Sequence, residues 1–319
     1  ALGAVANFEQ FQMNITGSSS SETLQIDDAT VSAFGGTFEA VILDTDGASG
    51  TAVVDASGSV LNSSNIVVDT DFDDTSTSSV KYLGGNAVES VTLSDQGDTI
   101  EYANAGYLSS DDGIVAGEGA DTLDFTGDTD SDTTISADQL GALSSVETVE
   151  ITGSGSGSSE TFTVNIDEAA ASANADSDGM FTVIGNGTDD DLVLDGSAVT
   201  DTDLALTGGA QEDTITGGAG DDTITMTAGN DTITLGDGDD DVVLTAGNGG
   251  NAITDFDFGD SETPNVDQFD LTDLSLGGKR EVAIESSAGS NNASQIVVLD
   301  NQARNNPTDV EAGVAGVLG

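Results

Sequence analysis

Aspartates recur at nine-residue intervals between residues 208 and 243, at Asp213, Asp222, Asp231 and Asp240. Each lies two residues before a large aliphatic residue and follows a short stretch that contains glycine. Carboxylate and carbonyl oxygens are the hard ligands that Ca²⁺ prefers. Two carboxylates about 5 Å apart repel by about 3 kcal/mol at an effective dielectric near ~20, unless a cation lies between them. The spacing therefore predicts a row of calcium sites with these four aspartates as ligands.

The sequence around each aspartate divides into a turn and a short strand. Glycine tolerates positive φ, so we expect the turns, and the carbonyl ligands that they supply, at Gly218, Gly220, Gly229 and Gly238. The stretch from Asp222 to Thr225 is typical of a strand with one inward aliphatic residue. If two units complete one coil, alternate units stack. This arrangement places Asp213 beside Asp231 and Asp222 beside Asp240.

One unit, Gly217 to Thr225, matches the pattern G-G-x-G-x-D-x-U-x at every fixed position, where U is a large aliphatic residue. The four units in register resemble the calcium-binding nonapeptide repeats of RTX proteins. The resemblance implies a parallel β-roll that binds Ca²⁺ in its turns. A fifth unit, Leu244 to Thr254, is stretched, places Gly249 at the acid position and is expected to close the roll. A metal-free acidic solenoid is the alternative interpretation.

Related turns also occur outside this block. Residues 117 to 123 keep the pattern G-x-G-x-D-x-U, which makes Asp121 a further candidate calcium ligand. Residues 185 to 192 keep the glycine turn and carry an excess of acid. Without a stacked partner unit, an acidic turn of this kind is instead a solvated loop.

The composition narrows the chemistry that the chain can perform. Its 319 residues contain 59 acidic and 4 basic side chains, for a net charge of −55, and no Cys or His. Disulfides, zinc fingers, thiol nucleophiles and Ser-His-Asp triads are therefore excluded within these residues. The charge disfavours nucleic acid and anionic membranes as partners, and no apolar run is long enough for membrane insertion. No carboxylate pair is singled out for catalysis, so we expect no enzymatic activity.

The predicted fold class is all-β, a β-solenoid or parallel β-roll with calcium-binding turns. Residues 1–180 are expected to be a β-rich, solenoid-like region with an internal duplication, and a β-sandwich-like N-terminal part is the alternative. The duplication compares the segment after Phe8 with the segment after Val146, which share an Ile-Thr-Gly triplet, a serine-rich run and Ser-Glu-Thr. One short helical turn is expected within residues 134–140. Residues 181–254 are the RTX-type calcium β-roll, and residues 255–319 are a C-terminal cap in which the resemblance implies a type I secretion signal.

The expected function is that of a calcium-dependent structural protein of the bacterial cell exterior, which self-assembles into a surface layer or an extracellular filament. Glutamate-initiated strands before the repeats are similar to those of bacterial surface-layer proteins. The expected partners are identical subunits and, in addition, cell-surface polysaccharide. The expected location is the extracellular space or the cell surface of a Gram-negative bacterium. The alternative is an adhesin or carbohydrate-binding fragment of a larger RTX protein.

Overall fold

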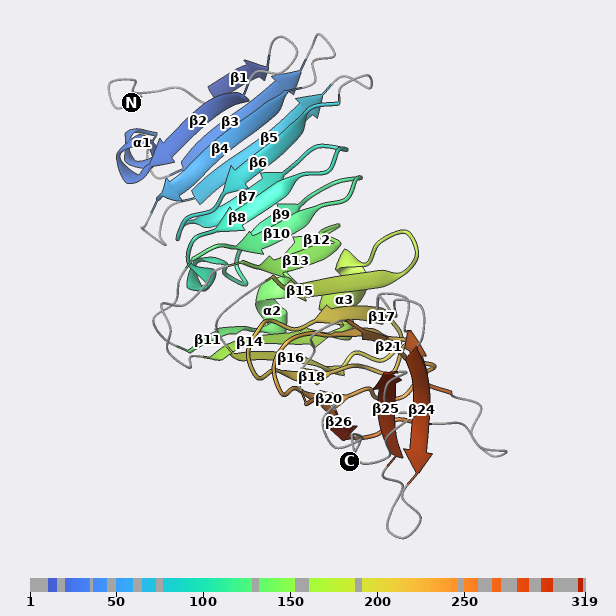
Figure 1. Ribbon diagram of the computed structural model, residues 1–319. Helices are drawn as coiled ribbons and strands as arrows, with labels where there is room; N and C mark the ends of the chain where they lie inside the picture. Colours follow the sequence, from blue (N-terminus) through green and yellow to red (C-terminus); the bar gives the residue numbers. More distant parts are fainter. Residues whose placement is uncertain are drawn as a thin grey trace.

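The computed structural model describes residues 11–15, 21–34, 37–44, 50–59, 65–72, 77–127, 132–152, 161–186, 191–245, 250–257, 266–270, 280–286, 294–300 and 315–317. Within these ranges the chain is a parallel β-solenoid, in which strands stack coil upon coil from the N-terminal end to the C-terminal end (Figure 1). The predicted all-β solenoid is confirmed.

One sheet of eleven parallel strands runs through most of the molecule. Its strands are, in order, β2 (Ser21–Asp27), β4 (Thr51–Gly58), β6 (Ser79–Leu83), β8 (Thr99–Tyr102), β10 (Thr122–Phe125), β13 (Thr148–Ile151), β15 (Met180–Gly185), β17 (Asp203–Thr207), β19 (Thr223–Met226), β21 (Asp241–Leu244) and β23 (Gln268–Asp270). Each strand pairs in parallel with the next, so that equivalent residues of successive coils form continuous files.

Two six-stranded parallel sheets supply the other strand of each coil. The first consists of β1 (Phe11–Ile15), β3 (Thr37–Asp44), β5 (Asn65–Phe72), β7 (Val88–Thr92), β9 (Gly113–Val115) and β12 (Leu143–Ser144). The second consists of β11 (Thr133–Ile135), β14 (Thr161–Asp167), β16 (Asp191–Ala198), β18 (Thr214–Thr216), β20 (Thr232–Thr234) and β22 (Ala252–Ile253). Because a β-sandwich is built from antiparallel sheets, the sandwich alternative is wrong for the described N-terminal strands.

The core lies between the sheets and consists of every second residue of each strand. In the repeat block the inward positions are the predicted aliphatics, Ile215, Ile224, Ile233 and Val242, all of which are buried. Burying one such side chain contributes about 1.5–3 kcal/mol. Ile215 is in register with Ile233, and Ile224 with Val242, which confirms that alternate units stack.

Short helices interrupt the coils at α1 (Asp28–Ala33), α2 (Ala137–Leu140), α3 (Glu168–Asn174) and the 3₁₀ turn η1 (Ala105–Tyr107). The helical turn expected within residues 134–140 is α2, which begins with a capping box between Ser136 and Gln139. Helices α1 and α3 follow the two duplicated Ser-Glu-Thr strands. Asp27 and Asp167 cap them by accepting hydrogen bonds from the backbone N–H of Thr30 and Ala170. Each of the two helices therefore begins after a strand that ends in a capping aspartate, although β2 lies in the eleven-stranded sheet and β14 in a six-stranded one.

The C-terminal residues add a separate antiparallel sheet of β24 (Arg280–Ser286), β25 (Ser294–Asp300) and β26 (Ala315–Val317). Strand β26 contacts β22, which is the last strand of the second six-stranded parallel sheet. In Figure 1, β24 and β25 are drawn toward the same end of the molecule as the C-terminal coils. Most of the segment expected to carry the secretion signal lies outside the described residues. None of the described helices is long and apolar enough to cross a membrane.

Candidate metal centre

A single file of residues runs along the edge of the eleven-stranded sheet where its strands begin. The pairing registers align, in successive coils, Asp98, Asp121, Glu147, Phe181, Leu204, Asp222, Asp240 and Asp267. Acidic residues thus form an N-terminal triplet (Asp98, Asp121 and Glu147) and a C-terminal triplet (Asp222, Asp240 and Asp267). The apolar residues Phe181 and Leu204 separate the two triplets.

An opposite triplet lies at the start of β18, β20 and β22 and consists of Asp213, Asp231 and Asn251. The stretched fifth unit therefore places Asn251 at the acid position. The prediction that Gly249 occupies the acid position is wrong, because the strand register aligns Asn251 with Asp231. Gly249 itself lies outside the described residues. The amide oxygen of Asn251 accepts a hydrogen bond from the backbone N–H of Asp231, at 2.9 Å.

Backbone hydrogen bonds hold the three triplets along the stack. The N–H of Asp98 donates to Oδ1 of Asp121 at 2.6 Å, and the N–H of Asp121 donates to Glu147 at 2.8 Å. In the C-terminal triplet the N–H of Asp222 donates to Oδ1 of Asp240 at 2.8 Å, and the N–H of Asp240 donates to Asp267 at 3.3 Å. These carboxylates point along the file because each accepts a hydrogen bond from the preceding coil.

The opposite triplet follows the same rule, with the N–H of Asp213 donating to Oδ1 of Asp231 at 3.1 Å. In all three triplets, Oδ2 of the first member accepts a hydrogen bond from a backbone N–H four residues earlier in the chain. The N–H groups of Ser94, Gly218 and Gly209 donate to Oδ2 of Asp98, Asp222 and Asp213, respectively.

The middle member of each triplet differs from the first. Oδ2 of Asp121, Asp231 and Asp240 is buried and has no hydrogen-bond partner. The exposed fractions of these side chains are 0%, 1% and 0%, respectively. A buried acceptor left unpaired costs about 1–3 kcal/mol, and more when it is charged. A cation bound beside these oxygens would remove that cost, so these three residues fit an ion.

The turns before the middle members take conformations that require glycine. Gly117 and Gly119 have φ of 110° and 134°, and Gly236 and Gly238 have φ of 112° and 143°. Gly229, before Asp231, has a φ of 127°. Of the predicted turn glycines, Gly229 and Gly238 are confirmed at positive φ. Gly218 and Gly220 do not adopt it, but a Cβ on Gly220 would lie 2.7 Å from the carbonyl oxygen of Thr202.

Burial raises the pKa of every aspartate in the triplets that the repeat pattern predicted. The pKa values of Asp213, Asp222 and Asp231 rise to about 6, and those of Asp121 and Asp240 to about 7. Loss of hydration is the main cause, and neighbouring carboxylates add to it. At Asp231 the backbone N–H of Thr227 lowers the pKa and so partly offsets this rise.

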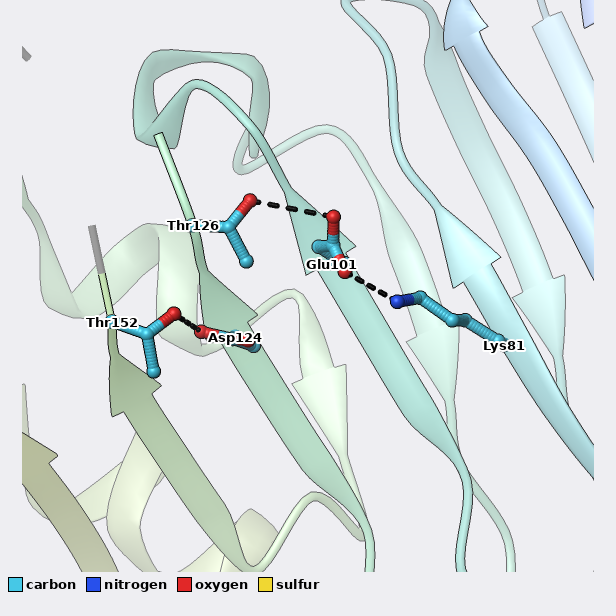
Figure 2. Close-up of polar contacts among 5 residues, drawn as sticks. All are labelled: Lys81, Glu101, Asp124, Thr126 and Thr152. Carbon is cyan, nitrogen blue, oxygen red and sulfur yellow. Dashed lines mark hydrogen bonds and ion pairs between the residues drawn. The ribbon is translucent and has the colours of Figure 1, made fainter. Parts of the chain in front are cut away.

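Unlike the triplet carboxylates, acidic residues on the outer face of the long sheet are stabilised by side-chain partners, as Figure 2 shows. Glu101 forms an ion pair with Lys81 at 2.6 Å and accepts a hydrogen bond from the Thr126 hydroxyl at 3.3 Å. Asp124 accepts a hydrogen bond from the Thr152 hydroxyl. Within the described ranges no basic side chain pairs with a triplet carboxylate, so the triplets lack this form of compensation.

Glu89 is a buried acid that lies outside the three triplets. Glu89 is 1% exposed and accepts hydrogen bonds from the backbone N–H of Gly85 and the hydroxyl of Tyr102. Burial raises its pKa to about 8, although both hydrogen bonds favour the charged form. Both of its oxygens are therefore occupied, in contrast to the middle aspartates of the triplets.

The geometry also limits what kind of ion site can form. Among the described residues no three acidic side chains converge as a ready-made metal cluster. An ion beside Asp121 or Asp240 would take most of its ligands from backbone carbonyls and water, a mixture typical of Ca²⁺. Beside the C-terminal triplet, a groove of about 950 Å³ is lined by Gly218, Gly236, Gly238 and Asp267, among others.

The structure places all five predicted aspartates in these triplets and adds four members that the pattern missed, Asp98, Glu147, Asn251 and Asp267. Each of the four lies two residues before an inward apolar residue, which is the signal that could have found them. Asp221 and Asp239, the neighbours at the variable turn position, are exposed. No family model matches the sequence, and comparison with curated proteins found no significant match.

Proposed function

We propose that this chain is an RTX-type protein whose solenoid folds around Ca²⁺ in its turns. The observation that carries the proposal is the pairing of Asp222 with Asp240 inside the block that matches the nonapeptide. There, the unpartnered oxygen of Asp240 follows two glycines at positive φ. Hard oxygen ligands, stacked carboxylates and the lack of a basic counter-ion among the described residues favour a divalent cation of the size of Ca²⁺.

The wider role that we propose is structural, as the subunit of a bacterial surface layer or extracellular filament. Subunits with a net charge of −55 repel one another, and a divalent ion can bridge them at contact distance. Identical subunits are the proposed partners, and the exterior of a Gram-negative cell, reached by type I secretion, is the proposed location. The solenoid occupies most of the described chain, which supports a structural role over an enzymatic one.

A second candidate function, an adhesin or carbohydrate-binding fragment, is favoured by a polar hollow of about 440 Å³. Its lining includes Asn86, Tyr107, Asp111 and Asp138. Planar polar groups beside one aromatic ring suit the hydroxyl groups and the apolar face of a sugar. Cell-surface polysaccharide is the ligand class that this candidate implies.

Two measurements test the main proposal. Circular dichroism in chelator should show loss of the β-structure of residues 208–254, which millimolar Ca²⁺ restores and equal Mg²⁺ does not. Electron microscopy with Ca²⁺ should show ordered sheets or filaments. Unchanged spectra in chelator would contradict calcium-dependent folding. Monomers that bind polysaccharide would favour the adhesin. Ordered assemblies in chelator with high NaCl would show that charge screening, without a bridging ion, is sufficient for assembly.

A further inference from the structure

We infer that the N-terminal triplet forms a second calcium site, between the turns at residues 94–98 and 117–121, which fills independently of the repeat block. The inference rests on the proposed function, because it takes the pair Asp222 and Asp240 as the reference site. The reference turns are residues 218–222 and 236–240. The inference goes beyond the proposed function because it assigns an ion to turns outside the repeat block. The first of these turns, Ser-Asp-Gln-Gly-Asp, lacks the glycine-rich pattern.

The second turn of each pair has nearly the same φ angles at its two glycines. Gly117 and Gly119 have φ of 110° and 134°, against 112° and 143° for Gly236 and Gly238. In each pair, these two glycines precede the middle aspartate by four and two residues. A positive φ reverses the direction of the peptide groups, so the two turns present their carbonyl oxygens in the same way.

The contact between successive turns is also the same. A Cβ on Gly117 would lie 2.1 Å from the carbonyl oxygen of Ser94, and a Cβ on Gly236 would lie 2.0 Å from that of Gly218. A Cβ on Gly119 would lie 2.8 Å from the carbonyl oxygen of Gln96. Its counterpart on Gly238 would lie 2.2 Å from that of Gly220. In both pairs a glycine turn therefore lies directly against the carbonyl groups of the preceding turn.

The carboxylates repeat the correspondence atom by atom. Asp98 uses Oδ2 to accept the N–H of Ser94, as Asp222 does with Gly218. Oδ1 of Asp121 accepts the N–H of Asp98, as Asp240 does with Asp222. Oδ2 is buried and unpartnered in both Asp121 and Asp240. The same oxygen therefore lacks a partner at both places.

The two sites are separated within the file by Phe181 and Leu204, which are fully buried and offer no ligand. Each coil of a solenoid contacts only its neighbours, so an ion at one triplet has little direct effect on the other. We expect one class of calcium binding from the N-terminal triplet and another from the repeat block. Ca²⁺ is favoured over Mg²⁺, which requires a compact octahedron and retains its water.

The test is a calcium titration of the full chain, with bound ions counted by equilibrium dialysis against Ca²⁺ alone. Asp121→Asn keeps an oxygen for the N–H of Asp98 but removes the charge. It should lose one bound ion, or bind it at least about tenfold more weakly, while the repeat-block class is unchanged. Glu118→Gln is the matched control because Glu118 lies exposed in the same turn, and it should bind as the wild type does.

Asp240→Asn distinguishes failure of this inference from failure of the proposed function. If Asp240→Asn loses binding and Asp121→Asn does not, the N-terminal site is wrong and the repeat-block site stands. If neither variant changes the number of bound ions, both are wrong. Circular dichroism in chelator should show Asp121→Asn at least as stable as the wild type, because the buried charge is gone. A variant that binds less calcium because it has unfolded would fail this check and overturn the assignment.

Discussion

Asp222 and Asp240 lie one above the other in successive coils, with the backbone N–H of the first 2.8 Å from Oδ1 of the second. The two carboxylates are not equivalent, however. Both oxygens of Asp222 accept backbone N–H groups, from Leu204 and Gly218, whereas Oδ2 of Asp240 is unpartnered. Their replacement should therefore have different effects.

Asp222→Ala should destabilise the chain with or without calcium, because it leaves two backbone N–H groups without acceptors. Each buried N–H group without an acceptor lowers the free energy of unfolding by about 1–3 kcal/mol. It should also need more calcium to fold, since a carboxylate beside the site is lost. Asp240→Asn should instead be at least as stable as the wild type in chelator and gain less from calcium. Thermal unfolding with and without Ca²⁺ measures both effects. Asp221→Ala is the control, and equal calcium midpoints for all three variants would mean that bulk charge governs binding.

The pH dependence in chelator should be that of buried acids. The folded-state pKa values of the repeat-block aspartates lie near about 6 to about 7, above an unfolded value near ~3.9. The folded state therefore binds more protons between pH ~4 and ~7, and its stability falls as the pH rises through this window. The unfolding temperature in chelator should be higher at pH 5 than at pH 7. Saturating Ca²⁺, which favours the charged form, should reduce or reverse the difference. A higher unfolding temperature at pH 7 than at pH 5 in chelator would contradict the assigned burial.

Glu89 should produce a separate loss of stability at higher pH, whether or not calcium is present. Its pKa of about 8 is raised by burial, so the stabilising neutral form is lost as the pH rises through that value. Glu89→Gln keeps an acceptor for Gly85 and a partner for Tyr102, but cannot ionise. The variant should unfold at a higher temperature than the wild type at pH 9, and the difference should shrink by pH 6. Glu118→Gln, on the surface, should show no such gain.

Replacing Gly238 by Ala should damage the fold more than replacing Gly113. At Gly238 the φ is 143° and a Cβ would lie 2.2 Å from the carbonyl oxygen of Gly220. At Gly113 a Cβ would meet nothing within 4 Å. We expect Gly238→Ala to lower the free energy of unfolding by more than about 1 kcal/mol, and Gly113→Ala to be close to neutral. Chemical denaturation in calcium measures both, and equal effects would contradict the turn geometry.

The regular spacing of the repeat block allowed its fold to be predicted closely. Because strand side chains alternate between faces, Ile215 and Ile224 could be placed inside, and the nine-residue unit fixed which coils stack. Before the block this counting fails, because Asp98 and Asp121 are 23 residues apart whereas Asp222 and Asp240 are 18 apart. Loops of different length hide the shared register, so Asp98 and Glu147 were not recognised as members of a triplet.

The nonapeptide pattern also does not specify which aspartate keeps an unpartnered oxygen. The unit that matches it fully contains Asp222, yet the unpartnered oxygen belongs to Asp240, whose unit begins with Leu235. The pattern G-x-G states where glycines lie, but not which of them adopt positive φ. That choice decides whether the local N–H reaches the carboxylate, and it depends on contacts with the neighbouring coil.

The two apolar members of the long file, Phe181 and Leu204, have a consequence for how the molecule comes apart. Stability in a linear stack is approximately a sum of local terms. The coils at Phe181 and Leu204 bury hydrocarbon where the coils of the two triplets on either side bury carboxylates, so their contribution is insensitive to chelator. Depletion of calcium should therefore loosen the stack on both sides of this segment, leaving it as the template from which order spreads again when ions return.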